Sequence, residues 1–180
     1  SRKKQNRLEG GVVGTLMSNF GLELALKDLD IPFVRAKVGD RYVMQELKSR
    51  GWTLGGESSG HLICLDKTTT GDGLVSALQV LSQLKFMQRP LHELASEMPL
   101  FPQKMINVTL AENSNASDIC ELEAVKQAIA KVEGDLADKG RILLRPSGTE
   151  PVIRVMVEGE DSALVERSCQ TISDVVAAQI

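Results

Sequence analysis

Two apolar segments in the last third of the chain, Ile142 to Leu144 and Val152 to Val157, limit what it can fold into. They are separated only by the polar and turn-forming residues Arg145 to Pro151. A parallel strand pair needs a crossover of about a dozen residues or more, so this short connection predicts an antiparallel pair. Alternate strand residues point to opposite faces, so Arg154 is expected on the face opposite to that of its two neighbours.

The connection itself, Arg-Pro-Ser-Gly-Thr-Glu-Pro, has the composition of an anion-binding loop. The two prolines fix φ at both ends, and Gly148 is expected to adopt a backbone conformation that a side chain would forbid. Successive N–H groups from residues 147–150 would form a concavity for phosphate, and the guanidinium of Arg145 matches phosphate oxygens. The hydroxyls of Ser147 and Thr149 are placed to join them. Ser-Gly-Thr is also ordinary turn composition, so spacing alone leaves both a phosphate site and a solvated hairpin open.

The first half of the chain alternates short apolar segments with segments of helical spacing. Strands are expected at residues 11–17, 33–38, 52–54 and 62–65, with helices between them at 22–29 and 40–50. A longer helix at 74–87 has leucines at helical spacing and is expected to be buried. Such alternation favours a mostly parallel sheet covered by helices, so a mixed-sheet α/β domain is predicted.

Three prolines between residues 90 and 102 mark a change in composition. Domain boundaries tend to fall in such segments, so two domains are expected, 1–98 and 99–180. The second should contain a strand at 105–110, a polar loop at 112–118, a helix at 121–138, the strand pair described above and a final helix. That final helix has an apolar stripe formed by Val165, Cys169, Ile172 and Val176. This order predicts a small α+β domain with an antiparallel sheet.

Composition narrows the classes of function. Aromatic residues make up 3% of the chain and the net charge is −3, which argues against nucleic acid as a partner. The basic cluster at residues 2–7 is interpreted as a solvated chain end. No signal-peptide pattern or long apolar run is present, so neither secretion nor membrane insertion is indicated. Three well-separated cysteines predict free, mostly buried thiols in a reducing cytoplasm.

A second polar loop, Gly55 to His61, separates two of the expected strands. Its glycines let the backbone approach a ligand closely, and the carboxylate of Glu57 can accept hydrogen bonds from adjacent sugar hydroxyls. Ser59 and His61 would complete a polar ring, and histidine titrates in the range that acid–base catalysis needs. The alternative is that Glu57 caps a turn and His61 is an ordinary residue at a strand end.

Two residues at the start of the helix at 40–50 are assigned different roles. Asp40 is expected to be the N-cap of that helix. Arg41 is a candidate for the same cleft as the loop at 55–61, because loops at one end of an open α/β sheet converge on a common site.

Other sites that the sequence suggests are rejected. Residues 56–60 fit the G-x-S-x-G elbow of serine hydrolases, but the elbow requires a following helix, whereas a strand is expected here. The first expected strand is not followed by the G-x-G-x-x-G of dinucleotide-binding folds. Asp66 and Asp72 are assigned to caps or turns rather than to a metal, because no second carboxylate cluster accompanies them.

Five segments, taken in order, resemble one family. They are VVGTLMSN at 12–19, VGDRYV at 38–43, GESSGH at 56–61, TTTGDG at 68–73 and RPSGTEP at 145–151. Their order and spacing are similar to those of bacterial phosphoglucosamine mutases, in the α-D-phosphohexomutase superfamily. The resemblance implies the third and fourth domains of a four-domain enzyme. That enzyme interconverts glucosamine 6-phosphate and glucosamine 1-phosphate for cell-wall precursor synthesis.

The resemblance also implies roles for the candidate residues. The sugar would be bound by Glu57 and Ser59, with Arg41 as a further candidate. His61 would line the sugar and is a candidate for proton transfer. Four residues would hold the phosphate that is not transferred: Arg145, Ser147, Gly148 and Thr149. Arg154 is a weaker member of this group.

Cofactors and partners follow from the same resemblance. Family members use Mg²⁺ and pass through glucosamine 1,6-bisphosphate, but their phosphorylated-serine loop and Mg²⁺ loop have no counterpart in this sequence. No metal ligand is therefore assigned, and the chain alone is expected not to catalyse the mutase reaction. Its partners would be a hexosamine phosphate and the missing N-terminal domains, with the fragment itself a cytoplasmic monomer.

Two alternatives remain open. The first is a fragment of a phosphoglucomutase or phosphomannomutase, although GESSGH and RPSGTE look more like the glucosamine branch. The second is a stand-alone phosphosugar-binding module. A reading frame that continues upstream of Ser1 into serine and metal loops would exclude this second alternative.

Overall fold

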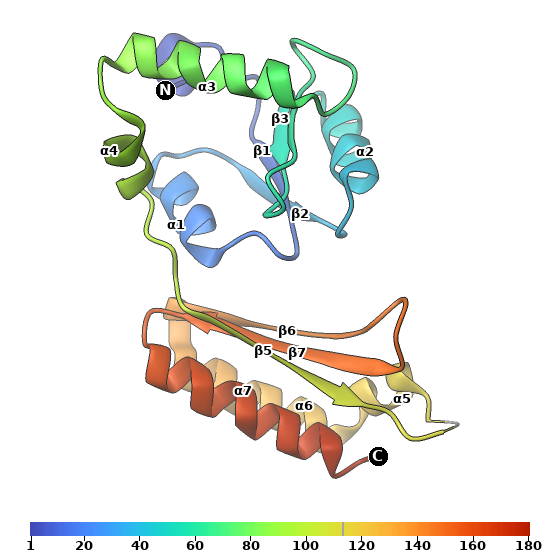
Figure 1. The fold of residues 1–180 in the computed structure, drawn as a ribbon. Helices are drawn as coiled ribbons and strands as arrows, with labels where there is room; N and C mark the ends of the chain where they lie inside the picture. The colour runs from blue at the N-terminus through green and yellow to red at the C-terminus, as the bar shows by residue number, and fades with distance from the viewer. Residues whose placement is uncertain (113) are drawn as a thin grey trace. The chain divides into compact units, whose positions relative to one another are not determined.

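A computed structural model describes residues 1–112 and 114–180 of the chain (Figure 1). The chain divides into two compact units, Ser1–Leu100 and Phe101–Ile180. Each unit has its own cluster of buried apolar side chains. The break between them falls within the proline-rich segment.

The first unit is built on a four-stranded sheet. Its strands are β1 (Val12–Thr15), β2 (Phe33–Ala36), β3 (Leu54–Gly56) and β4 (Leu62–Cys64), in the order β2-β1-β3-β4. β1 is parallel to both β2 and β3, whereas β4 is antiparallel to β3. The predicted mixed-sheet α/β architecture is therefore confirmed.

Helices accompany this sheet, including one at each of the three places where the apolar spacing predicted them. They are η1 (Lys3–Gln5), α1 (Phe20–Asp28), α2 (Asp40–Arg50), α3 (Gly73–Met87) and α4 (Leu91–Ser96). α2 buries Val43 and Leu47 in one cluster with Val13 of β1 and Ile63 of β4. This packing fixes the start of α2 relative to the strand ends that carry the polar loops.

The predicted burial of α3 is wrong. Leu74, Leu78 and Leu81 are 81%, 62% and 58% exposed, and α3 has no buried residue. Helical spacing identifies which residues share a face, but the tertiary structure decides what covers that face. Within the described residues, these leucines form an exposed apolar stripe.

The basic N-terminal segment is exposed at Lys3, Lys4 and Arg7, as expected of a solvated end, but its Arg2 is anchored. Arg2 Nη1 donates to Asp66 Oδ1 at 3.0 Å, and the Arg2 side chain is only 11% exposed. Lys3 donates to two main-chain carbonyls just after α1. Burial acts to raise the pKa of Asp66, but hydrogen bonds from Lys67 and Arg2 outweigh it, so that pKa lies below its usual value.

The third strand lies later in the chain than predicted. Residues 52–54 were expected to form it, whereas β3 includes Gly55 and Gly56. A Cβ atom at Gly55 would lie 2.7 Å from Val43 Cγ1 on α2. Glycine therefore allows α2 to pack directly on β3, a role that the sequence pattern does not separate from that of a loop glycine.

The second unit has a three-stranded antiparallel sheet, as predicted. Its strands are β5 (Gln103–Thr109), β6 (Gly140–Pro146) and β7 (Val152–Gly159), in the order β5-β7-β6. Its helices are α5 (Ala116–Glu121), α6 (Glu123–Leu136), η2 (Ala137–Lys139) and α7 (Ser162–Ala177). Figure 1 shows α6 and α7 along one face of this sheet.

The core of the second unit confirms two sequence patterns. Ile153, Val155 and Val157 of β7 are buried in the cluster that the helices cover. The four residues of the predicted α7 stripe are buried in the same cluster: Val165, Cys169, Ile172 and Val176. Arg154, between Ile153 and Val155, therefore lies on the opposite face of the sheet, as predicted.

The predicted helix at 121–138 is divided in two. Leu122 has an extended backbone (φ −61°, ψ 141°), which ends α5 at Glu121 and starts α6 at Glu123. α5 begins inside the predicted polar loop at 112–118, because Asn115 Oδ1 accepts a hydrogen bond from the Ser117 N–H at 2.9 Å. Residue 113 of that loop lies outside the described residues.

The three cysteines are free, as predicted, and Cys64 and Cys169 are buried. Burial raises the pKa of all three thiols. In the described part of the chain, no helix combines the length and the apolar character that crossing a membrane requires.

Candidate functional site

The connection between β6 and β7 is a compact turn. The Ser147 N–H donates to the Val152 carbonyl at 2.9 Å, and the Val152 N–H donates to the Glu150 carbonyl at 2.8 Å. The Thr149 N–H points to Ser147 Oγ at 3.5 Å, a long hydrogen bond. Ser147 therefore uses its N–H within the turn, so that N–H is not available to the predicted cradle.

The conformation predicted for Gly148 is wrong. The described glycines with positive φ are Gly10, Gly39, Gly51 and Gly60, and Gly148 is not among them. A Cβ built at Gly148 would also meet nothing within 4 Å. Pro146 belongs to β6, and its cyclic backbone together with Pro151 constrains the turn, so the loop does not require a left-handed glycine.

Two arginines lie opposite each other at the base of this turn. Arg145 on β6 pairs in register with Arg154 on β7, so their side chains share one face of the sheet. Among the described residues, the Arg145 guanidinium has no hydrogen-bond or ion-pair partner. Arg154 Nη2 donates to Glu150 Oε2 at 2.6 Å. The structure thus brings together the residues predicted to bind phosphate, with two cationic side chains on one face of the sheet.

The loop after β3 is closed by its own main chain. The Glu57 N–H donates to the His61 carbonyl at 2.9 Å, and the Gly60 N–H donates to the Glu57 carbonyl at 3.1 Å. Gly60 has φ +93°, a conformation that favours glycine. The loop is therefore a tight turn between β3 and β4, which confirms that a strand and not a helix follows it.

The carboxylate of Glu57 binds the main chain directly before α2, where Asp40 was predicted to act. Glu57 Oε1 accepts a hydrogen bond from the Gly39 N–H at 2.8 Å, directly before α2. The N-cap of α2 is Gly39, and no side-chain capping bond is made there, so the prediction that Asp40 is the N-cap is wrong. Gly39 has φ +124°, which turns the chain so that Asp40 becomes the first helical residue.

His61 lies between two further segments. Its Nδ1 is 3.8 Å from Asp40 Oδ2, an ion-pair distance that is too long for a hydrogen bond. A Cβ atom at Gly71 would lie 2.0 Å from His61 Nε2, so the ring rests against the main chain at Gly71. Three segments distant in sequence therefore meet at this histidine.

Two other residues predicted to bind the sugar, Arg41 and Ser59, make no hydrogen bond to Glu57 or His61. Arg41 Nη2 donates to the Tyr42 hydroxyl at 2.7 Å, and its guanidinium lies 4.7 Å from the centre of that ring. Ser59 is exposed and has no hydrogen-bond partner among the described residues. Neither side chain is oriented by contacts with Glu57 or His61.

A cavity of about 380 Å³ adjoins the loop. Its polar lining includes Glu57 and Ser58 from the loop, together with Ser18 and Asn19 from the turn after β1. Ser59 and His61 do not line it. No role was predicted for the turn after β1, although its polar Ser-Asn pair directly after an apolar strand was a visible signal.

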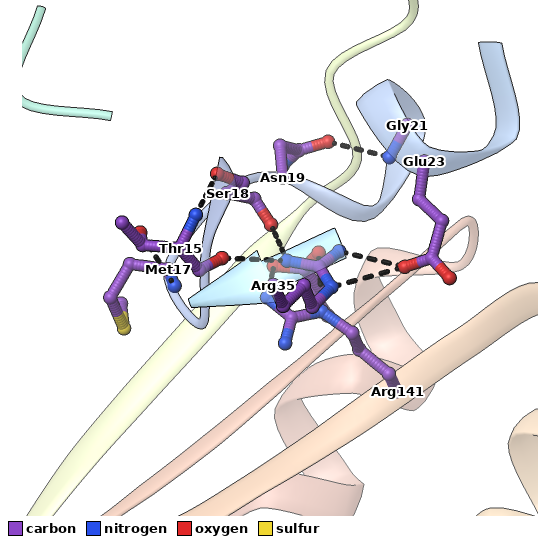
Figure 2. A network of polar contacts seen from close by, with 9 residues as sticks. Thr15, Met17, Ser18, Asn19, Gly21, Glu23, Arg35 and Arg141 are labelled. Carbon is purple, nitrogen blue, oxygen red and sulfur yellow. Dashed lines mark hydrogen bonds and ion pairs between the residues drawn. The ribbon is translucent and has the colours of Figure 1, made fainter. Parts of the chain in front are cut away.

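The turn after β1 is held by a network centred on Arg35 (Figure 2). The Arg35 guanidinium donates to the Thr15 carbonyl at 3.0 Å and to the Ser18 carbonyl at 2.6 Å. It also donates to Glu23 Oε2 at 2.9 and 3.1 Å. Asn19 Oδ1 accepts from the Gly21 N–H at 3.0 Å and caps α1. These bonds fix the position of the turn that lines the cavity.

No group of three or more His, Cys, Asp or Glu residues in the described part of the chain is arranged to hold an ion. Asp72, predicted to be a cap or turn residue, caps α3 by accepting a hydrogen bond from the Val75 N–H at 2.9 Å.

Both units match one protein family. Residues 1–101 match the alpha/beta/alpha domain III of the phosphoglucomutase/phosphomannomutase family, and residues 105–175 match the C-terminal domain of that family. The phosphoglucosamine mutases of Pasteurella multocida and Erwinia tasmaniensis are 59% and 58% identical to the chain over 175 residues, 97% of its length. The chain spans 39% of the length of these relatives.

Solved structures share the fold. The Aspergillus fumigatus N-acetylphosphoglucosamine mutase, in complex with GlcNAc-6P and magnesium, aligns with a TM-score of 0.73 at 21% identity. That alignment covers 95% of this chain and 42% of the other. An N-acetylglucosamine-phosphate mutase in its product complex aligns with a TM-score of 0.75 at 21% identity, over 98% of this chain and 40% of the other.

Proposed function

The chain belongs to the phosphoglucomutase/phosphomannomutase family, and on that basis we propose that it is the sugar- and phosphate-binding part of a phosphoglucosamine mutase. Such an enzyme interconverts glucosamine 6-phosphate and glucosamine 1-phosphate. The observation that carries the proposal is the 59% identity to a phosphoglucosamine mutase over nearly the whole of this chain. The loop sequences GESSGH and RPSGTEP support the same sugar over glucose or mannose.

The phosphate that is not transferred is assigned to the turn between β6 and β7. The free guanidinium of Arg145 supplies a planar pair of donors that matches phosphate oxygens. Thr149 and the N–H of Gly148 add neutral donors, Ser147 adds its hydroxyl, and Arg154 adds a second charge. A reaction that passes through a 1,6-bisphosphate needs one phosphate held in a fixed site while the other reacts, and we assign that fixed site to the donors of this turn and of the two strands beside it.

The sugar hydroxyls are assigned to the loop after β3. Glu57 uses Oε1 to bind the Gly39 N–H, which leaves Oε2 to accept hydrogen bonds from a ligand. Ser59 is exposed and free to turn toward a bound sugar, and Arg41 would have to leave Tyr42 to reach it. His61, in contact with Gly71 and near Asp40, is assigned to the sugar as a candidate for proton transfer.

No metal ligand is assigned, because no cluster of ligands is present among the described residues. Because the phosphorylated-serine loop and the Mg²⁺ loop of the family have no counterpart in this sequence, we expect the 180 residues alone to bind the substrate without converting it.

An NMR titration of the ¹⁵N-labelled chain with glucosamine 6-phosphate tests the proposal. Charge-assisted hydrogen bonds contribute about 1.5–3 kcal/mol each, less the cost of association, so we expect dissociation constants of about 1 mM or weaker. Amide shifts should appear at 147–149 and at 57–61. Arg145→Ala should weaken binding at least about tenfold.

The matched control is Arg167→Ala, because Arg167 is an exposed arginine on α7 and its loss changes the net charge equally. Glucose 6-phosphate and mannose 6-phosphate, titrated in parallel, test the choice of sugar. The proposal is wrong if wild-type spectra do not respond to high ligand concentration, or if Arg145→Ala binds as tightly as Arg167→Ala.

A further inference from the structure

The opposed arginines at the base of the β6–β7 turn place two positive charges close together. Arg145 and Arg154 are directly paired across the two strands. Directly opposite residues have Cβ atoms about 4.5–5.5 Å apart, and like charges in that position are destabilising. An anion placed between the two guanidinium groups would remove this repulsion.

One carboxylate already neutralises one of the two arginines. Glu150 Oε2 accepts the hydrogen bond from Arg154 Nη2 at 2.6 Å, and the main chain of Glu150 is held by the Val152 N–H. The bond satisfies Arg154 incompletely, because its Nε is buried and has no hydrogen-bond partner among the described residues. Arg145 receives nothing from Glu150. The carboxylate is therefore a partial substitute for an anion that could contact both arginines.

The Glu150 side chain is free to leave this position. It is 56% exposed, whereas that of Arg154 is 28% exposed. Rotation of the Glu150 side chain would move its carboxylate into solvent without breaking the main-chain hydrogen bonds of the turn. Arg154 Nη2 would then be available to donate to an oxygen of a phosphate.

We propose that the Glu150 carboxylate competes with the phosphate of the ligand for Arg154. Glu150 is thus a specificity-determining residue that occupies Arg154 until a phosphate displaces it. This inference rests on the function proposed above and adds a residue to that site. A monoanionic carboxylate bonded to one arginine yields to a phosphate with more charge and three oxygens that can bridge both. Ligands that cannot bridge the two arginines form fewer bonds in exchange for displacing Glu150, so they bind more weakly.

The size of the effect follows from the exposure of the pair. Exposed ion pairs contribute up to about 1 kcal/mol, which corresponds to about a fivefold change in an equilibrium constant. Glu150→Gln removes the competing charge while keeping the length of the side chain. It should therefore tighten the binding of glucosamine 6-phosphate about twofold to fivefold.

The experiment is the same NMR titration, applied to Glu150→Gln, Glu150→Ala and a control. Glu133→Gln is the control, because Glu133 is exposed on α6 and its substitution changes the net charge equally. Both Glu150 variants should bind more tightly than the wild-type chain and the control. In the wild-type chain, the carboxylate ¹³C signal of Glu150 should shift as the ligand saturates the site.

The outcomes separate this inference from the proposed function. If the wild-type chain binds, Arg145→Ala does not, and both Glu150 variants bind equally or more weakly, then Glu150 orients Arg154 and the competitor role is wrong. If Arg145→Ala binds as tightly as wild type, the proposed phosphate site itself fails. A Glu150 ¹³C signal that does not shift at saturation would also overturn the displacement.

Discussion

Replacing Ile172 with alanine tests whether the second unit is stabilised by a core of its own. Ile172 is 0% exposed and lies in the cluster formed by α7, α6 and the inner face of the second sheet. The substitution removes three carbon atoms, which at about 0.8 kcal/mol each corresponds to about 2.4 kcal/mol of transfer free energy. The cavity left behind adds to this, and buried isoleucine-to-alanine changes cost about 2–5 kcal/mol.

The single tryptophan allows the two units to be followed separately. Trp52 packs against the core of the first unit, so its fluorescence reports the unfolding of that unit. Far-UV circular dichroism reports the helices and strands of both. In a domain of this size, 1 kcal/mol shifts the unfolding temperature by about 4–8 °C, so Ile172→Ala should lower one circular-dichroism transition by at least about 8 °C.

Leu47→Ala is the matched variant in the first unit, where Leu47 is also 0% exposed. It should lower the Trp52 transition, whereas Ile172→Ala should leave that transition unchanged. If Ile172→Ala shifts Trp52 fluorescence as far as circular dichroism, the two units unfold together and the assumption of independent cores is wrong. A loss of less than about 1 kcal/mol would instead contradict the burial of Ile172.

Two further predictions concern single contacts. Burial raises the pKa of the Cys169 thiol in the folded chain, so its contribution to stability is complete below the unfolded-state value of about 8.5 and is lost as the pH rises above it. Denaturation midpoints of the second unit, measured from pH 7 to 10, should fall with pH in the wild-type chain and less steeply in Cys169→Ala; equal slopes would exclude the thiol as the cause. Gly71→Ala should displace the His61 ring, whose Nε2 lies 2.0 Å from the position of the new Cβ, while changing stability by less than about 0.5 kcal/mol. Unchanged His61 ring resonances in an NMR spectrum of this variant would show that the ring does not rest on Gly71.

Elements with a strong local pattern were predictable from the sequence. The α7 stripe and the alternation along β7 each specify a buried face through their own spacing, and both are confirmed. The short Arg145–Pro151 connection was sufficient to predict an antiparallel pair. In these cases the residues that decide the structure are close together in the chain.

Features that depend on distant contacts were not predictable in this way. The spacing of Leu74, Leu78 and Leu81 specifies a common face but not what covers it. Gly55 and Gly148 were both assigned to ligand loops, yet Gly55 is a packing position under α2, whereas Gly148 has open space where a side chain would lie. Residue type alone does not distinguish a glycine whose Cβ would clash with a packed neighbour from a glycine with open space around it.

The start of α2 shows how a contact between residues distant in sequence shapes the candidate sugar site. An aspartate at the beginning of a helix is a common N-cap, so Asp40 was assigned that role. The structure gives the hydrogen bond before α2 to Glu57, which is distant in sequence, and Asp40 is thereby left to face His61. The same contact fixes one oxygen of Glu57 and leaves the other available to a ligand. Segments 38–43, 56–61 and 68–73 therefore depend on one another through Glu57, Asp40 and Gly71, and a substitution in any one of them should disturb the geometry of His61.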